Sequence, residues 1–261
     1  MQILLFSVLA LVAEILGTIG GFGSSMIFVP LAGFFFDFKV VLGITAVFHL
    51  FSNVAKISMF RHGLDKRIIR QIGIPAIIAV IVGASLSRYV DTNISRLLLG
   101  VFLIGLSLSL LLKPGFILRP VVSNAVSGGA LSGFTAGLLG TGGAIRGLTL
   151  AAFDLEKNIF IATSAVIDLG VDLSRSVVYF GNGFIRKEDL YLVPILIVVS
   201  TLGTWLGKKL LERFSQQQFK KLVLFLILGV GIMNILTFVL ENRSVSGSPA
   251  KASSVQRSKH G

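Results

Sequence analysis

Two glycine-rich clusters, one in each half of the chain, contain groups that could bind an anion. Their candidate substrate-binding residues are Gly20, Gly21, Gly23 and Ser24 in the first cluster, and Gly140, Thr141, Gly142 and Gly143 in the second. Glycine lets a helix break and lets successive N–H groups point the same way, and the next helix offers its positive end to an anion. The alternative is close helix packing through small residues, which we expect for Gly133/Gly137 and Gly203/Gly207.

Cations inside apolar stretches are the second chemical signal. Arg146 follows the second cluster by three residues, and Lys56 and Arg175 occupy matching positions in two apolar segments. A charge at the centre of a bilayer costs at least about 2.5–3.5 kcal/mol, so such residues usually face a cavity and mark a pathway. A guanidinium can bind an anion bidentately. Each cation could instead be neutralised internally, as Arg175 could be by Asp172 one helical turn earlier.

Titratable side chains in the same stretches could carry a proton. The candidates for proton coupling are Glu14, His49, Asp168 and Asp172. Asp168 and Asp172 are four positions apart and share a helix face, so one of two desolvated carboxyl groups could hold a proton. Imidazole titrates near neutral pH. Each of these residues could also be a hydrogen-bond partner that holds two helices together.

The surrounding chain is far more apolar than a soluble protein. Of its 261 residues, 54% are hydrophobic and 14% are charged, whereas soluble domains carry about 25% charged residues. Lipid can cover such an exterior, so we predict an all-α, polytopic integral membrane protein. The chain has no cysteine, which excludes disulfides and thiolate metal sites. His49, His62 and His260 are too scattered for a metal cluster, and no metal or cofactor is expected.

Uncharged runs predict about eight membrane segments. Six are ordinary spans, with uncharged runs over 40–55, 72–87, 97–112, 158–167, 190–207 and 222–240. Two are longer, glycine-broken or re-entrant regions, 1–36 and 121–153. A crossing helix needs about 20 residues, and the run at 158–167 is expected to continue past its charges. Residues 1–17 are interpreted as a retained helix, because a signal peptide needs a basic start and the first cation is Lys39.

A repeat with a shift of about 120 residues relates the two halves. Pro75 matches Pro194, and the glycine clusters match each other. A polar triple with spacings of four and three also recurs, as His49, Asn53 and Lys56 in one half and as Asp168, Asp172 and Arg175 in the other. We therefore predict a first membrane repeat over 1–115, a second over 116–240, and a disordered basic tail over 241–261.

The distribution of Lys and Arg favours inverted halves. If both glycine regions return to the side from which they enter, interior loops hold twelve Lys/Arg and exterior loops five. If both regions cross once, the numbers are eight and nine. The positive-inside rule prefers the first arrangement, although the basic tail then lies outside. Inverted repeats with broken helices in corresponding positions are typical of secondary transporters.

At its two glycine clusters the sequence resembles the TauE/SafE family of sulfite-exporter-like membrane proteins. The resemblance rests on 17–30 with Thr45-Ala46, and on 137–147 with 162–164, and it covers nearly the whole chain except the tail. It implies an inner-membrane carrier of two related halves, with sulfite, sulfoacetate or another small organic anion as substrate. The commoner family pattern has three consecutive glycines in the first cluster, whereas Phe22 interrupts them here and could narrow the site.

These features predict a secondary transporter that moves sulfite, an organosulfonate or a related small anion across a bacterial inner membrane, with coupling to protons as an option. Asn53, Lys56, Arg146 and Arg175 join the cluster residues as predicted substrate contacts. The expected partners are the small anion and the lipid bilayer. Nucleic acid is not expected despite the net charge of +12, because the cations fall between apolar runs.

Two other classes of function remain open at the level of sequence. A passive anion channel or a membrane scaffold would have the same apolar segments. An intramembrane hydrolase could use Ser24, Ser25 and His49 as nucleophile and base, although no nucleophile elbow surrounds either serine. We expect no enzyme activity, and no nucleotide-binding P-loop pattern occurs in the chain.

Overall fold

The computed structural model describes residues 2–33, 35–60, 63–89, 121–151, 153 and 155–246, together with isolated residues between 97 and 112. Every regular element in these ranges is a helix, as the all-α prediction requires. Within these ranges, five helices are long and apolar enough to cross a membrane: Ile3–Gly20, Phe38–Met59, Lys66–Leu86, Leu192–Leu211 and Gln217–Leu240. The predicted span at 97–112 and the tail after Ser246 lie largely outside the described residues, so the count of eight segments stays a prediction.

The first half begins with a broken helix. Helix α1 (Gln2–Gly20) ends at the first glycine cluster, and α2 (Ser25–Ala32) begins after residues 21–24. Helix α3 (Phe38–Met59) follows. The next helix is continuous but mixed, with α4 (Lys66–Ile68), the π-helical turn η1 (Ile69–Gly73) and α5 (Ile74–Leu86). The π turn ends two positions before Pro75, which lacks an N–H donor and whose ring would clash with the carbonyl of the preceding turn in a regular α-helix.

The second half repeats this order. Helix α7 (Val122–Leu139) ends at the second glycine cluster, and α8 (Gly143–Ala151) begins after residues 140–142. Helix α9 (Lys157–Gly181) continues past its charged residues, as expected from the sequence. A short turn, η2 (Lys187–Asp189), leads to α10 (Leu192–Leu211). Helix α11 (Gln216–Ser246) closes the described chain and extends six residues into the range predicted as the tail.

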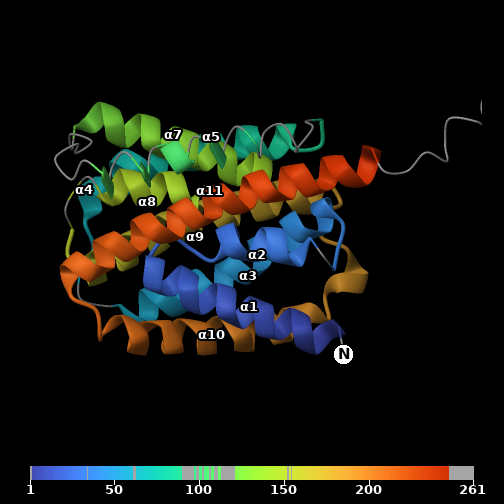
Figure 1. The fold of residues 1–261 in the computed structure, drawn as a ribbon, viewed down its shortest axis with the longest axis horizontal. Helices are drawn as coiled ribbons and strands as arrows, with labels where there is room; N and C mark the ends of the chain where they lie inside the picture. Colours follow the sequence, from blue (N-terminus) through green and yellow to red (C-terminus); the bar gives the residue numbers. More distant parts are fainter. Residues whose placement is uncertain are drawn as a thin grey trace, which may run out of the picture.

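The two halves pack on each other reciprocally. Helix α1 lies along α10 and α7 lies along α5, at opposite sides of the bundle, with α3 and α9 in contact between them (Figure 1). Glycines bring these helices close, because a Cβ on Gly203 would lie 2.7 Å from Glu14 Cβ and one on Gly133 would collide with the Ala76 carbonyl oxygen. Gly137 and Gly207 also face neighbouring helices closely. The predicted packing through small residues is therefore confirmed.

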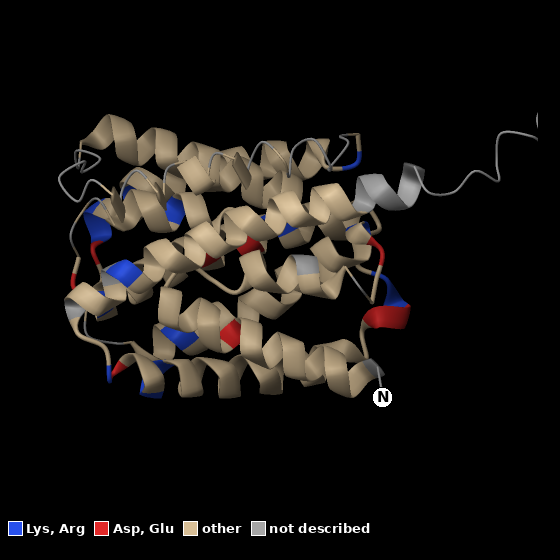
Figure 2. Cartoon of the chain, viewed as in Figure 1, with Lys and Arg blue, Asp and Glu red and all other residues tan. Residues whose placement is uncertain are grey.

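The exterior of the bundle is apolar. Large side chains such as Leu4, Ile78, Val198 and Phe225 are more than half exposed. Charged residues gather at the two ends of the helices and at a few positions in the middle (Figure 2). A wide apolar band between charged ends is unstable in water and suits a lipid bilayer, so the structure agrees with an integral membrane protein. The charges in the middle of the bundle form the candidate site.

Candidate functional site

Both glycine clusters break a helix, and each break contains a glycine with positive φ. Gly21 has φ 71° and Gly140 has φ 75°, a conformation that glycine adopts without strain. The two residues are 119 positions apart, and so are Leu42 in α3 and Ile161 in α9. A Cβ on Gly21 would lie 2.9 Å from Ile161, and one on Gly140 would lie 2.5 Å from Leu42. Each break therefore packs against the long helix of the other half, and the two contacted positions, Leu42 and Ile161, correspond to each other in the repeat.

The two breaks also contact each other through Phe22, which interrupts the first glycine cluster. Its side chain is buried, and a Cβ on Gly147 would lie 3.0 Å from the ring. A Cβ on Gly143 would collide with the Phe22 carbonyl oxygen. Ser25 and Gly143 begin α2 and α8, and the N–H groups of a first helical turn have no acceptor within their own helix. Two positive helix ends therefore lie near the centre of the molecule.

We expect Gly143→Ala to lower the melting temperature, because the added methyl group would meet a backbone carbonyl that cannot move without shifting the first break. Overpacking of this kind typically costs about 1–3 kcal/mol. Gly229→Ala in α11 is the matched control, since nothing lies within 4 Å of its added Cβ. Thermal unfolding in detergent compares the two variants. A Gly143→Ala protein as stable as the control would show that the breaks do not depend on this contact.

Glu14 is the centre of a buried hydrogen-bond network beside the first break. Its carboxylate pairs with Lys56 Nζ at 2.8 Å and accepts hydrogen bonds from four hydroxyl groups. These donors are Thr18 at 3.2 Å, Ser24 at 2.6 Å, Ser52 at 2.6 Å and Thr204 at 3.1 Å. Ser24 is also the N-cap residue of α2, but its side chain makes no capping hydrogen bond. Thr204 belongs to α10, so this carboxylate also joins the two halves.

His49 connects the Glu14 network to the acids of α9. Its Nε2 lies 3.0 Å from Ser24 Oγ, and its Nδ1 lies 3.7 Å from Asp172 Oδ2. When the Ser24 proton goes to Glu14, the Nε2–H group of His49 is the donor to Ser24. The order serine, histidine, aspartate also occurs in hydrolase triads, but here the Ser24 hydroxyl group also lies 2.6 Å from Glu14 Oε2, so Glu14 competes with His49 for the serine proton.

Arg146 connects the second break to the first. It lies in the first turn of α8, and its guanidinium donates to the Phe22 carbonyl oxygen at 2.9 Å and to Ser164 Oγ at 3.0 Å. The same group forms an ion pair with Asp168. A Cβ on Gly23 would lie 3.5 Å from Asp168 Oδ2, so the carboxylate lies against the first break. Arg146 and Asp168 thus stand between the two breaks.

Arg175, which lies on α9, forms hydrogen bonds to the second break. Its Nη1 donates to the Gly140 carbonyl oxygen at 2.9 Å, and its Nη2 pairs with Asp172 Oδ1 at 2.7 Å. Asp172 also accepts from Asn53 Nδ2 at 2.7 Å, across the two halves. Arg175 Nε and Asn53 Oδ1 are buried and have no protein partner within the described residues. An unpaired donor and acceptor in one cluster are typical of a place where water or a ligand completes the hydrogen bonds.

Every candidate residue predicted from the sequence is buried, and together these residues surround the two breaks. Thr141 and Gly142 lie within the second break, and Gly20 ends α1 at the first. Sequence reasoning missed several hydroxyl groups that complete the cluster: Thr18, Ser52, Ser164, Tyr179 and Thr204. Thr18, Ser52, Ser164 and Tyr179 could have been found, because each is four positions from a buried charged residue on its own helix. Thr204 is brought in by tertiary packing alone.

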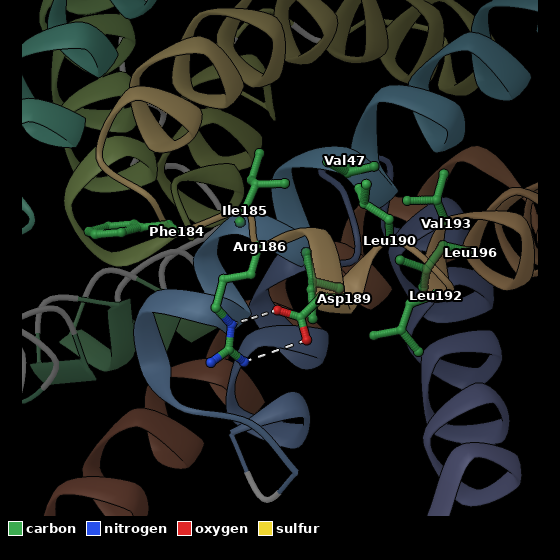
Figure 3. Close-up of a pocket in the computed structure, with 11 residues that line it drawn as sticks. Val47, Phe184, Ile185, Arg186, Asp189, Leu190, Leu192, Val193 and Leu196 are labelled. Atoms are coloured by element: carbon green, nitrogen blue, oxygen red, sulfur yellow. Dashed lines mark hydrogen bonds and ion pairs between the residues drawn. The ribbon is translucent and has the colours of Figure 1, made fainter.

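A small surface pocket lies away from this polar cluster, where η2 and α10 begin beside α3 (Figure 3). Its walls are mostly apolar, and Arg186 Nε pairs with Asp189 Oδ2 at 2.9 Å beside it. None of the candidate residues lines this pocket. We assign it no role at the site, because the buried charges and the helix breaks lie elsewhere.

Comparisons with known proteins agree with a role in membrane transport. The profile of the Sulfite exporter TauE/SafE family matches residues 6–234. A probable membrane transporter protein of Methanocaldococcus jannaschii is 25% identical over 254 residues, which cover 87% of this chain and 92% of the relative. No solved structure matches the chain.

Proposed function

Because the chain belongs to the TauE/SafE family of sulfite exporters, we propose that it is a secondary transporter for a small anion. The observation that carries this proposal is the contact between two broken helices around Arg146. The guanidinium supplies a planar fork of donors, and the starts of α2 and α8 supply N–H groups nearby.

We further propose that the two halves are inverted repeats related by a pseudo-two-fold axis. The reciprocal contacts of Gly21 with Ile161 and of Gly140 with Leu42 support this, because a two-fold relation exchanges matching residues. In such transporters, one repeat rocks against the other around a site near the middle of the membrane. The glycine breaks then form a fixed site, and the surrounding helix pairs open it to one side at a time.

The substrate class is proposed from the chemistry of the cluster. A planar guanidinium beside two helix starts suits a small oxyanion such as sulfite or a short organosulfonate. Phe22 adds an apolar wall beside Arg146, where the organic end of a sulfonate could lie. The family resemblance implies a bacterial inner membrane as the location. Coupling to protons is proposed through the acids and His49, which border the same cluster.

A thermal-stability screen of the purified protein tests this function. A ligand that binds only the folded state stabilises it by about 2.7 kcal/mol at a hundredfold excess over Kd. We therefore expect sulfite or a small sulfonate to raise the melting temperature by several degrees. Chloride at equal ionic strength is the control and should have no such effect. If sulfite, sulfate, thiosulfate and small sulfonates all leave the melting temperature unchanged and cross no proteoliposome membrane, the proposal is wrong.

A further inference from the structure

We propose that the substrate anion takes the place of Asp168 at Arg146, and that the displaced Asp168 carboxyl group binds a proton. One proton would then accompany each monovalent anion. The inference rests on the proposed transport of an anion and adds the coupling step. No covalent bond changes, since an ion pair is exchanged and a carboxylate is protonated.

The charge balance of the cluster is the first argument. Within the described residues, the buried cations Lys56, Arg146 and Arg175 each pair with a carboxylate. With neutral His49, the three acids and three cations cancel. An added monovalent anion would leave one negative charge without compensation in a region of low dielectric, which is strongly unfavourable. A proton taken up with the anion restores the balance.

Of the three buried acids, Asp168 has the fewest hydrogen-bond and ion-pair partners that its displacement from a cation would disturb. Glu14 accepts from four hydroxyl groups besides Lys56, and Asp172 accepts from Asn53 besides Arg175. Asp168 is held by Arg146 alone among the described residues. Its side chain is 9% exposed, compared with 0% for Glu14 and 2% for Asp172. A carboxylate with one partner and some access is the one that an incoming anion can replace.

The groups around Asp168 favour this exchange. Arg146 faces it from α8, His49 and Lys56 lie on α3, and Asp172 and Arg175 lie on its own helix. Helices α5 and α7, which also contact α9, carry no charged residue over their described lengths. The turn η1 contributes only Arg70, which is exposed. The positive groups thus remain in place for the anion after Asp168 becomes neutral.

The exchange site occurs in one half only. The position 119 residues before Arg146 is Ile27, and the position 119 residues before Ser164 is Thr45. Ser164 accepts from Arg146, whereas Thr45 Oγ1 is buried and has no protein partner within the described residues. The first half therefore has the matching hydroxyl without the cation. One exchangeable ion pair among the described residues predicts one anion and one proton per cycle.

The experiment measures methanesulfonate binding to the purified protein by calorimetry as a function of pH. A sulfonate stays ionised throughout, so any pH dependence belongs to the protein. For the wild type, we expect Kd to rise about tenfold per pH unit wherever Asp168 is ionised in the free protein. Calorimetry in two buffers with different ionisation enthalpies should count one proton taken up per anion. This count needs no variant and is independent of any folding defect.

Asp168→Asn should bind methanesulfonate with a Kd that no longer depends on pH and with no proton uptake. Asp189→Asn, whose carboxylate pairs with Arg186 outside the polar cluster, is the control and should keep both the slope and the proton count. Anion binding by the wild type without proton uptake would overturn the inference and leave the transport proposal standing. Retention of the slope in Asp168→Asn would overturn the assignment to this residue. If no anion in the screened panel binds or is transported, the proposed function fails together with the inference.

Discussion

Arg146→Gln is expected to abolish anion binding and flux and to destabilise the protein. Asp168 would remain buried without its cation, and the loss of one partner of a buried ion pair typically costs about 3–5 kcal/mol. The Phe22 carbonyl oxygen and Ser164 would lose a donor as well. Thermal unfolding reports the stability, and uptake of labelled sulfite into proteoliposomes reports the flux.

The double variant Arg146→Gln/Asp168→Asn separates these two effects. It removes both charges, so its melting temperature should return most of the way to that of the wild type. Anion binding should stay lost, because the guanidinium is still missing. A double variant that recovers both stability and flux would show that Arg146 serves only to neutralise Asp168.

Glu14→Ala is expected to cause the largest loss of stability. The change leaves Lys56 buried without an anion, at a typical cost of about 3–5 kcal/mol, and removes the acceptor of four hydroxyl groups. Since about 1 kcal/mol corresponds to a shift of roughly 2–4 °C in a protein of this size, the melting temperature should fall by more than about 10 °C.

Two further variants test the cause of this loss. Glu14→Gln keeps an acceptor oxygen for the hydroxyl groups, and Glu14→Gln combined with Lys56→Met also removes the unpaired cation, so stability should recover stepwise. Val12→Ala on the outward side of α1, where Val12 is 43% exposed, should change little. If Glu14→Ala unfolds at the same temperature as Val12→Ala, the network around Glu14 does not stabilise the fold.

The positions of the site residues could be predicted from the sequence because polar groups and glycine clusters are conspicuous in apolar helices. Gly21 and Gly140 occupy equivalent positions in the two halves, and so do the polar triples that contain Lys56 and Arg175. All of these residues lie in or around the breaks. The pairing of Arg175 with Asp172 also follows from their spacing on one helix.

The partners across helices could not be predicted in the same way. Glu14 and Lys56 lie on different helices, and nothing in their spacing indicates that they form an ion pair. Thr204 reaches Glu14 only because α10 of the second half packs along α1 of the first. The order of helices along the chain does not determine which helices touch. The π turn that precedes Pro75 could likewise not be predicted, because a proline indicates an irregular position in a helix without determining the kind of turn.

The ion pairs have a consequence for how the chain enters the bilayer during synthesis. Glu14 and Lys56 both belong to the first half, whereas Arg146, Asp168, Asp172 and Arg175 all belong to the second. Each half can therefore cancel its own charges before it meets the other. The links between the halves, such as that from Asn53 to Asp172, have at least one uncharged partner. Insertion of each half and assembly of the two halves can thus be separate stages, because these buried charges have their ion-pair partners within the same half.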